Sequence, residues 1–217
     1  MQFSKNKINQ YIFFIIISIL IIFNGGNSNL LIQFNFLFFS TFFLLCLKKK
    51  NYQLHLKLFY QDNKIYLFFY ILFLFYLFLQ VIPLPVNFLK FFSYEKYLYL
   101  DKLQKNIFYS PISLDPTKSY FQILNYISLL LIILILKMIF YTDKHKDRFF
   151  LFLSFVGFVT SSIAVLLYLN NNPNFLIFEN SFYKDASTGF FINRTVFAVF
   201  LVFCLIASLE VLKKIEN

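Results

Sequence analysis

The sequence is poor in charge and in several residue types that would indicate a soluble fold. Its 217 residues include no tryptophan, 2 cysteines, 4 glycines and only 14% charged residues. With 59% hydrophobic residues, the low charge excludes a soluble globular domain and favours a lipid bilayer as the solvent. Cys46 and Cys204 both fall within apolar runs, so no disulfide framework is predicted. Without tryptophan, tyrosine alone supplies the interfacial aromatic side chains.

Motifs of several enzyme classes are also missing. There is no Walker loop, dinucleotide fingerprint, nucleophile elbow or Cys/His metal cluster in the sequence. His55 and His145 have no neighbouring ligands, and both are interpreted as solvated loop residues. We therefore predict no metal and no cofactor, and the residues by themselves specify no reaction.

Long apolar runs dominate what is present. They predict an all-α, polytopic transmembrane helix bundle of about six helices, a single integral-membrane domain. A signal peptide is the alternative interpretation of the first run. The predicted helices cover residues 8–23, 30–47, 65–82, 121–141, 149–169 and 195–212.

The polar connections carry weaker signals. Residues 52–60 alternate with a period of two, which favours a short strand or a segment lying on the interface. Residues 142–148 are predicted to be a short charged loop. Loops 86–120 and 170–193 are longer, and residues 87–100 are amphipathic enough to form a helix along the surface.

The net charge of +10 has two possible meanings. Nucleic acid binding would need a basic patch, whereas here the lysines flank the apolar runs, so no nucleic acid partner is predicted. The lysines are interpreted as topology signals. Lysine and arginine are more abundant at the two termini and in 48–64 and 142–148, which favours both termini in the cytoplasm. Loops 86–120 and 170–193 would then be periplasmic.

One stretch, residues 186–203, combines a glycine, an Asn-Arg pair and a long apolar run. Gly189 allows a turn where a side chain would be crowded. Arg194, which follows Asn193, is one of only two arginines, and a guanidinium binds phosphate bidentately. The alternative is an interfacial arginine that anchors a helix end.

Residues 189–198, G-F-F-I-N-R-T-V-F-A, resemble the Gly-x-Phe-x-Asn-Arg-Asn-x-Phe-Ala motif of the O-antigen ligase and polymerase family. Residues 79–85 (L-Q-V-I-P-L-P) and 111–117 (P-I-S-L-D-P-T) resemble two upstream segments of that family, in the same order. The resemblance spans roughly 65–212. Thr195 and Val196 depart from it, since they replace the usual Asn-His.

The resemblance implies a metal-independent glycosyltransferase at the periplasmic face of a bacterial inner membrane. Its donor would be a polyprenyl-diphosphate-linked glycan, and its acceptor a lipid A core or another glycan chain. Arg194 would contact the diphosphate, Asn193 would orient Arg194, and Gly189 would let the loop approach closely. Family members continue well past this motif, so we expect an amino-terminal portion that is inactive alone. The competing hypothesis is a non-enzymatic membrane protein, either a small transporter or a structural subunit.

Overall fold

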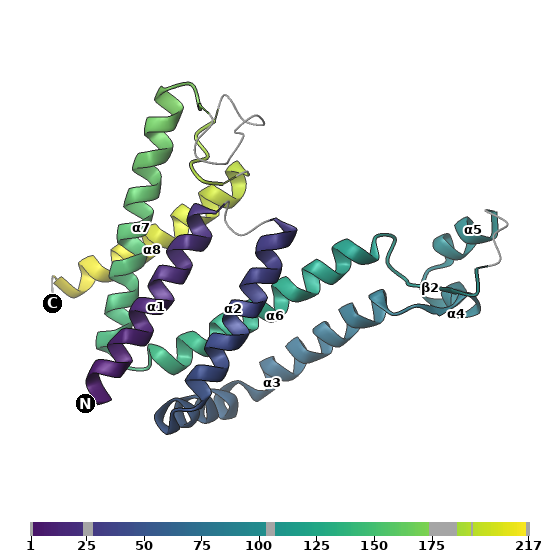
Figure 1. Ribbon diagram of the computed structural model, residues 1–217, viewed down its shortest axis with the longest axis horizontal. Helices are drawn as coiled ribbons and strands as arrows, with labels where there is room; N and C mark the ends of the chain where they lie inside the picture. The colour runs from purple at the N-terminus through teal and green to yellow at the C-terminus, as the bar shows by residue number, and fades with distance from the viewer. Residues whose placement is uncertain (1, 24–27, 103–106, 174–185, 192, 216–217) are drawn as a thin grey trace. The chain divides into compact units, whose positions relative to one another are not determined.

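A computed structural model describes the chain except for residues 1, 24–27, 103–106, 174–185, 192 and 216–217, and describes residues 2–6 by their backbone alone (Figure 1). The described residues form eight helices and one pair of short strands, which confirms the all-α prediction. The helices are α1 (Gln2–Ile22), α2 (Asn29–Leu47), α3 (Lys50–Val81), α4 (Val86–Phe92), α5 (Tyr94–Lys102), α6 (Pro116–Ile139), α7 (Asp143–Leu169) and α8 (Arg194–Ile215). The strands, β1 (Leu84–Pro85) and β2 (Tyr109–Ser110), pair antiparallel.

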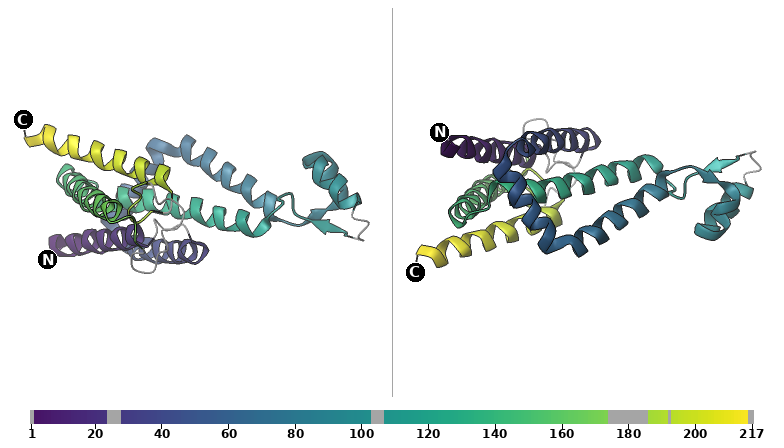
Figure 2. Two further views of the ribbon diagram at one scale, coloured as in Figure 1. Left: turned by 90° about the horizontal axis from the view of Figure 1, so that it is seen from above. Right: turned by 90° about the horizontal axis from the view of Figure 1, so that it is seen from below.

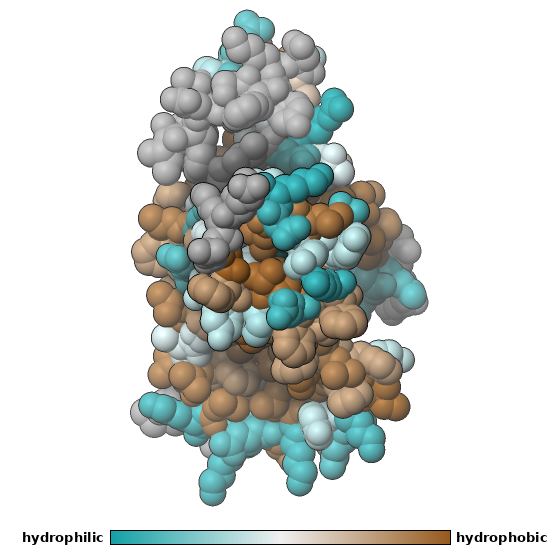
Figure 3. All heavy atoms as spheres, turned by 90° about the vertical axis from the view of Figure 1, so that its right-hand side faces the viewer, coloured by the Kyte–Doolittle hydropathy of each residue, from teal (hydrophilic) through white to brown (hydrophobic). Residues whose placement is uncertain are grey.

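Five helices, α2, α3, α6, α7 and α8, are long and apolar enough to cross a membrane. The predicted first span, 8–23, corresponds to α1, whose apolar part Lys7–Ile22 is shorter. Hydrophobic residues cover much of the molecular face drawn in Figure 3. Because large apolar side chains are exposed along the helices themselves, the chain is a multi-pass membrane protein.

The strand considered for residues 52–60 is wrong, because these residues form the first turns of α3. Tyr52 is buried and Leu56 and Phe59 are half-buried, so burial follows the helical spacing of three to four residues. At Asn63 the backbone leaves helical geometry (φ −122°, ψ 18°), and the Asn63 Nδ2 atom donates to the Phe59 carbonyl at 3.0 Å. The predicted span 65–82 is the part of α3 that follows this kink.

The charged loop predicted at 142–148 is also wrong, because α7 begins at Asp143. Thr142 caps the helix, since its hydroxyl accepts the backbone N–H of His145 at 3.3 Å. His145 therefore lies on a helix, half-buried with its ring 5.2 Å from the Tyr141 ring. His55 likewise lies within α3, so neither histidine belongs to a loop. Charged residues can continue a helix beyond an apolar run, and hydropathy alone does not reveal this.

The amphipathic helix predicted at 87–100 is present as two short helices, α4 and α5, which are separated at Ser93. Ser93 leaves helical geometry (φ −155°, ψ 75°), although its N–H still donates to the Leu89 carbonyl. The connection between α3 and α6 is also shorter than the predicted loop, because α6 begins at Pro116. Proline suits the first position of a helix, where its missing N–H is not needed.

The chain divides into two compact units, residues 1–31 with 136–217 and residues 32–135. In the first unit, Gly157 of α7 meets Cys204 of α8, and small residues allow such close helix contacts. The Lys214 ammonium pairs with Asp147, and Arg148 donates to the Gln10 side chain at 3.1 Å. These contacts hold α1, α7 and α8 together at the end that contains the start of α7.

In the second unit, α3 and α6 run side by side in both views of Figure 2. The Tyr70 hydroxyl of α3 donates to the Tyr126 carbonyl of α6 at 2.8 Å. The rings of Phe73 and Tyr126 also meet edge to face, with centroids 5.1 Å apart. This hydrogen bond and this ring contact hold the two helices together in lipid, where no hydrophobic driving force acts between helices.

Candidate functional site

The segment that leads into α8 is anchored on α7 by Gly189. Its φ of +56° lies in the left-handed region, and the N–H of Phe191 closes the turn on the Thr188 carbonyl at 3.0 Å. A Cβ atom at Gly189 would stand 3.1 Å from the Ala164 Cβ atom and 3.6 Å from the Thr160 carbonyl oxygen. The predicted need for glycine at this turn is therefore confirmed, and the neighbour that would be crowded is α7.

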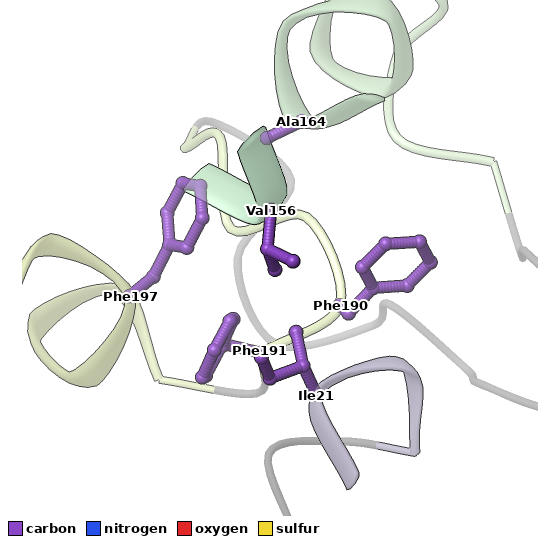
Figure 4. Packing of buried hydrophobic residues seen from close by; sticks show 6 residues of the cluster. All are labelled: Ile21, Val156, Ala164, Phe190, Phe191 and Phe197. Carbon is purple, nitrogen blue, oxygen red and sulfur yellow. The ribbon is translucent and has the colours of Figure 1, made fainter. Parts of the chain in front are cut away.

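Phe190 and Phe191, which follow this glycine, are both buried. Figure 4 shows them on the turn, in a cluster with residues of three helices. The cluster comprises Ile21 of α1, Val156 and Ala164 of α7, Phe197 of α8, and the two turn residues Phe190 and Phe191. The burial of the two phenylalanines holds the turn at Gly189 against α1 and α7.

Asn193 caps α8. Its Oδ1 atom accepts the N–H of Thr195 at 2.8 Å, and its carbonyl accepts the N–H of Phe197 at 3.1 Å. The capping explains why the helix starts at Arg194, whose side chain is exposed. The structure thus places all three predicted site residues in one short segment, with Gly189 buried against α7 and Asn193 and Arg194 at the beginning of α8.

An apolar groove of about 310 Å³ lies beside this helix start. On α8 it is lined by Val196, Val199, Phe200 and Phe203. Opposite them lie Phe191 and the α1 residues Ile17, Leu20 and Ile21. Val196 belongs to the same first turn as Arg194, so the groove extends from that turn for about 10 Å along one face of α8. The spacing 196, 199, 200, 203 is visible in the sequence, but its partner face on α1 is not.

Chemically, the segment offers an exposed guanidinium at the positive end of a helix dipole, next to an apolar groove. The guanidinium and the positive end of the helix dipole both attract an anion, and the groove suits an alkyl or isoprenoid tail. Within the described residues there is no group of three His, Cys, Asp or Glu side chains that could hold a metal ion. The combination of a positive group and an apolar groove is the chemistry that suits an amphiphile with an anionic head.

The two other segments that carried the resemblance lie together in the second unit. Leu84 of β1 pairs with Ser110 of β2, and the Ser113 N–H donates to the Gln80 carbonyl at 2.9 Å. Residues 79–85 and 111–117, separated by a long connection in sequence, therefore form one structure. The hydrophobic and proline-rich character of each segment did not predict this pairing.

A buried lysine, which the sequence did not single out, fastens this structure. The Lys96 ammonium of α5 donates to the carbonyls of Pro111 and Ser113. Burial lowers the pKa of Lys96 below its usual value. Two residues after Ser113, Asp115 caps α6 by accepting the N–H of Lys118 at 3.0 Å.

Comparison of the chain with protein-family models, with curated proteins and with solved structures finds no match. The fold by itself defines the class of the protein, which is a multi-pass helical membrane protein.

Proposed function

We propose that this protein binds a polyprenyl-diphosphate-linked glycan at the start of α8 and takes part in its transfer or polymerisation, as in the O-antigen ligase and polymerase family. The observation that carries the proposal is the shared first turn of α8, which presents Arg194 and also lines the apolar groove through Val196. The three resemblances to family motifs supply the reaction class.

The chemistry of the donor suits these two features. A glycan leaving from a diphosphate leaves negative charge on that diphosphate, and a fixed guanidinium stabilises the charge as it develops. The helix amide dipoles of α8 add to this effect, because a helix amino terminus favours anions. The isoprenoid tail would lie along Val199, Phe200 and Phe203, which form the α8 wall of the groove.

In this proposal Arg194 is the diphosphate contact. Gly189 contributes by letting the turn pack on Ala164, and Asn193 contributes by orienting the first turn that carries Arg194. The acceptor would be a lipid A core or another glycan chain. The reaction would take place at the periplasmic face of a bacterial inner membrane, with both termini of the chain in the cytoplasm.

Binding tests the site directly. The purified chain in lipid nanodiscs is titrated with undecaprenyl diphosphate, undecaprenyl monophosphate and undecaprenol. We expect the diphosphate to bind most tightly and Arg194→Ala to weaken it at least tenfold, because charge-assisted bidentate contacts are lost. Arg194→Lys should bind with intermediate affinity. The matched control is Lys64→Ala, which removes an exposed positive charge from the second unit.

Transfer is tested in the organism that encodes the chain. Arg194→Ala in its own gene should abolish the surface-glycan ladder while the amount of the protein in the membrane is unchanged. Equal affinity of the parent and Arg194→Ala for the diphosphate would overturn the binding role. An intact ladder in the variant would favour the non-enzymatic alternative, a small transporter or a structural subunit.

A further inference from the structure

The kink in α3 creates a second apolar groove, in the unit formed by residues 32–135. At Asn63 the helix changes direction, and Figure 2 shows the bend. Residues 50–62 before the kink carry charged and polar side chains, whereas the part after it is almost wholly apolar. This change in polarity along one helix is typical of a segment that passes from the interface into the bilayer.

The groove lies between both parts of α3 and the helix α6, and its volume is about 420 Å³. The part of α3 before the kink contributes Leu56, Phe59 and Tyr60 to its wall. Leu67 and Ile71 come from the part after the kink, and Leu130 and Leu134 come from α6. The volume falls within the range of ligand pockets, and the wall is overwhelmingly apolar.

A single positive charge stands at this groove. Lys57 lines it, is exposed, and has no ion pair or hydrogen bond within the part of the chain that the structure describes. Gln53 also lines the groove, and its Nε2 atom already donates to the Leu47 carbonyl at 2.7 Å. The groove therefore combines a hydrophobic wall with an ammonium group that is available to an anion.

We propose that this groove is a binding site for an anionic phospholipid, with an acyl chain against Leu67, Ile71 and Leu130 and the headgroup phosphate on Lys57. The occupant follows from the charge and the polarity of the wall. An apolar groove in a membrane protein takes a lipid chain, and a basic residue that lines the groove selects a negatively charged headgroup. The inference is independent of the proposed function, because it concerns other residues in the other unit.

The absence of tryptophan makes a clean fluorescence test possible. Tyr60→Trp places a single tryptophan on the wall of the groove, at a position that is already aromatic. The variant is reconstituted with phosphatidylglycerol or phosphatidylethanolamine that carries brominated acyl chains, which quench tryptophan on contact. We expect the anionic lipid to associate about fivefold more strongly than the zwitterionic lipid, because this is the size of the attraction between one lysine near the membrane surface and anionic lipid.

Two substitutions on this background separate the groove from general surface charge. Lys57→Gln should reduce the ratio between the two lipids to about one. Lys50→Gln is the matched control, because Lys50 is an exposed lysine two turns earlier on the same helix and outside the groove, and it should keep most of the preference. Circular dichroism verifies the helix content of each variant, and Phe59→Trp repeats the measurement from a second position of the wall.

A ratio near one in the Tyr60→Trp and Phe59→Trp proteins would overturn the proposal. An equal loss of preference in Lys57→Gln and Lys50→Gln would overturn it as well, because diffuse attraction by the lysines would then explain the selectivity.

Discussion

Gly157 and Cys204 bring α7 and α8 into direct contact: a Cβ atom on Gly157 would stand 2.4 Å from the Cys204 Cβ atom and 2.9 Å from its Sγ atom. Neither atom can move far, because Cys204 is buried and both residues lie within helices. The contact lies between the Lys214–Asp147 ion pair at one end of these helices and the turn of Gly189 at the other. It therefore helps to determine where the first turn of α8 stands.

The first prediction is that Gly157→Ala destabilises the protein by about 1–3 kcal/mol, as overpacking does in a tight core. Thermal unfolding in detergent, followed by circular dichroism, measures the change. Adding Cys204→Gly should restore most of the stability, because it removes the Cβ and Sγ atoms that the new Cβ atom at position 157 would meet. An alanine that instead stabilises the protein, as it does on an exposed helix face, would show that the contact is loose.

A second prediction concerns the turn at Gly189. Alanine there must adopt a φ of +56° and meet Ala164, so Gly189→Ala should cost roughly 1–2 kcal/mol in the free energy of unfolding. Gly189→Ala with Ala164→Gly should recover only the part due to crowding. Gly189→Asn adopts positive φ more readily, so it separates the two causes. Full recovery in the double variant would mean that the backbone conformation contributes nothing.

The cap of α8 provides a third prediction. Asn193→Ala should cost about 1 kcal/mol, whereas Asn193→Ser should be nearly neutral, because serine also accepts the N–H of the first turn. If the role of Asn193 is to place the first turn, Asn193→Ser should also retain the affinity for undecaprenyl diphosphate. Normal stability with lost affinity would instead mean that the amide itself contacts the ligand or Arg194.

The pKa of Asp115 gives a prediction about pH. The hydrogen bond from the Lys118 N–H holds the pKa of this carboxyl below its ordinary value of 3.8. A lowered pKa contributes stability that is fully present above pH 3.8 and is lost as the pH falls through the value in the folded protein. The melting temperature of Asp115→Asn should therefore fall less than that of the parent protein in this acidic window. Parallel curves for the two proteins would contradict the assignment.

Topology is tested by single cysteines in a protein whose Cys46 and Cys204 are replaced by alanine. A cysteine at Leu114, which is 84% exposed, should react with an impermeant thiol reagent added to the periplasmic side. A cysteine at Asn51, which is also exposed, should react only after the membrane is permeabilised. The reverse pattern would invert the orientation derived from the distribution of lysine.

The spans were predictable because a helix in lipid satisfies its own backbone hydrogen bonds, so an apolar run of sufficient length specifies it locally. The turn at Gly189 was predictable for a similar reason, since a glycine beside bulky aromatics indicates a crowded or left-handed backbone. Such features depend on neighbours in the sequence. The starts of α3 and α7 were not predictable, because polar residues after a cap such as Thr142 continue a helix as readily as they form a loop.

Only the tertiary structure decided which segments meet. The ammonium of Lys96 reaches the carbonyls of Pro111 and Ser113 across a long connection, and composition does not encode that contact. The groove beside Arg194 needs α1 opposite α8, and the groove at Lys57 needs α6 beside a kinked α3. Hydropathy determines that a helix lies in lipid but leaves open which face packs against which neighbour, because lipid chains are as apolar as the helices themselves. The sites therefore follow from side-chain packing between distant segments, while the helices follow from the sequence itself.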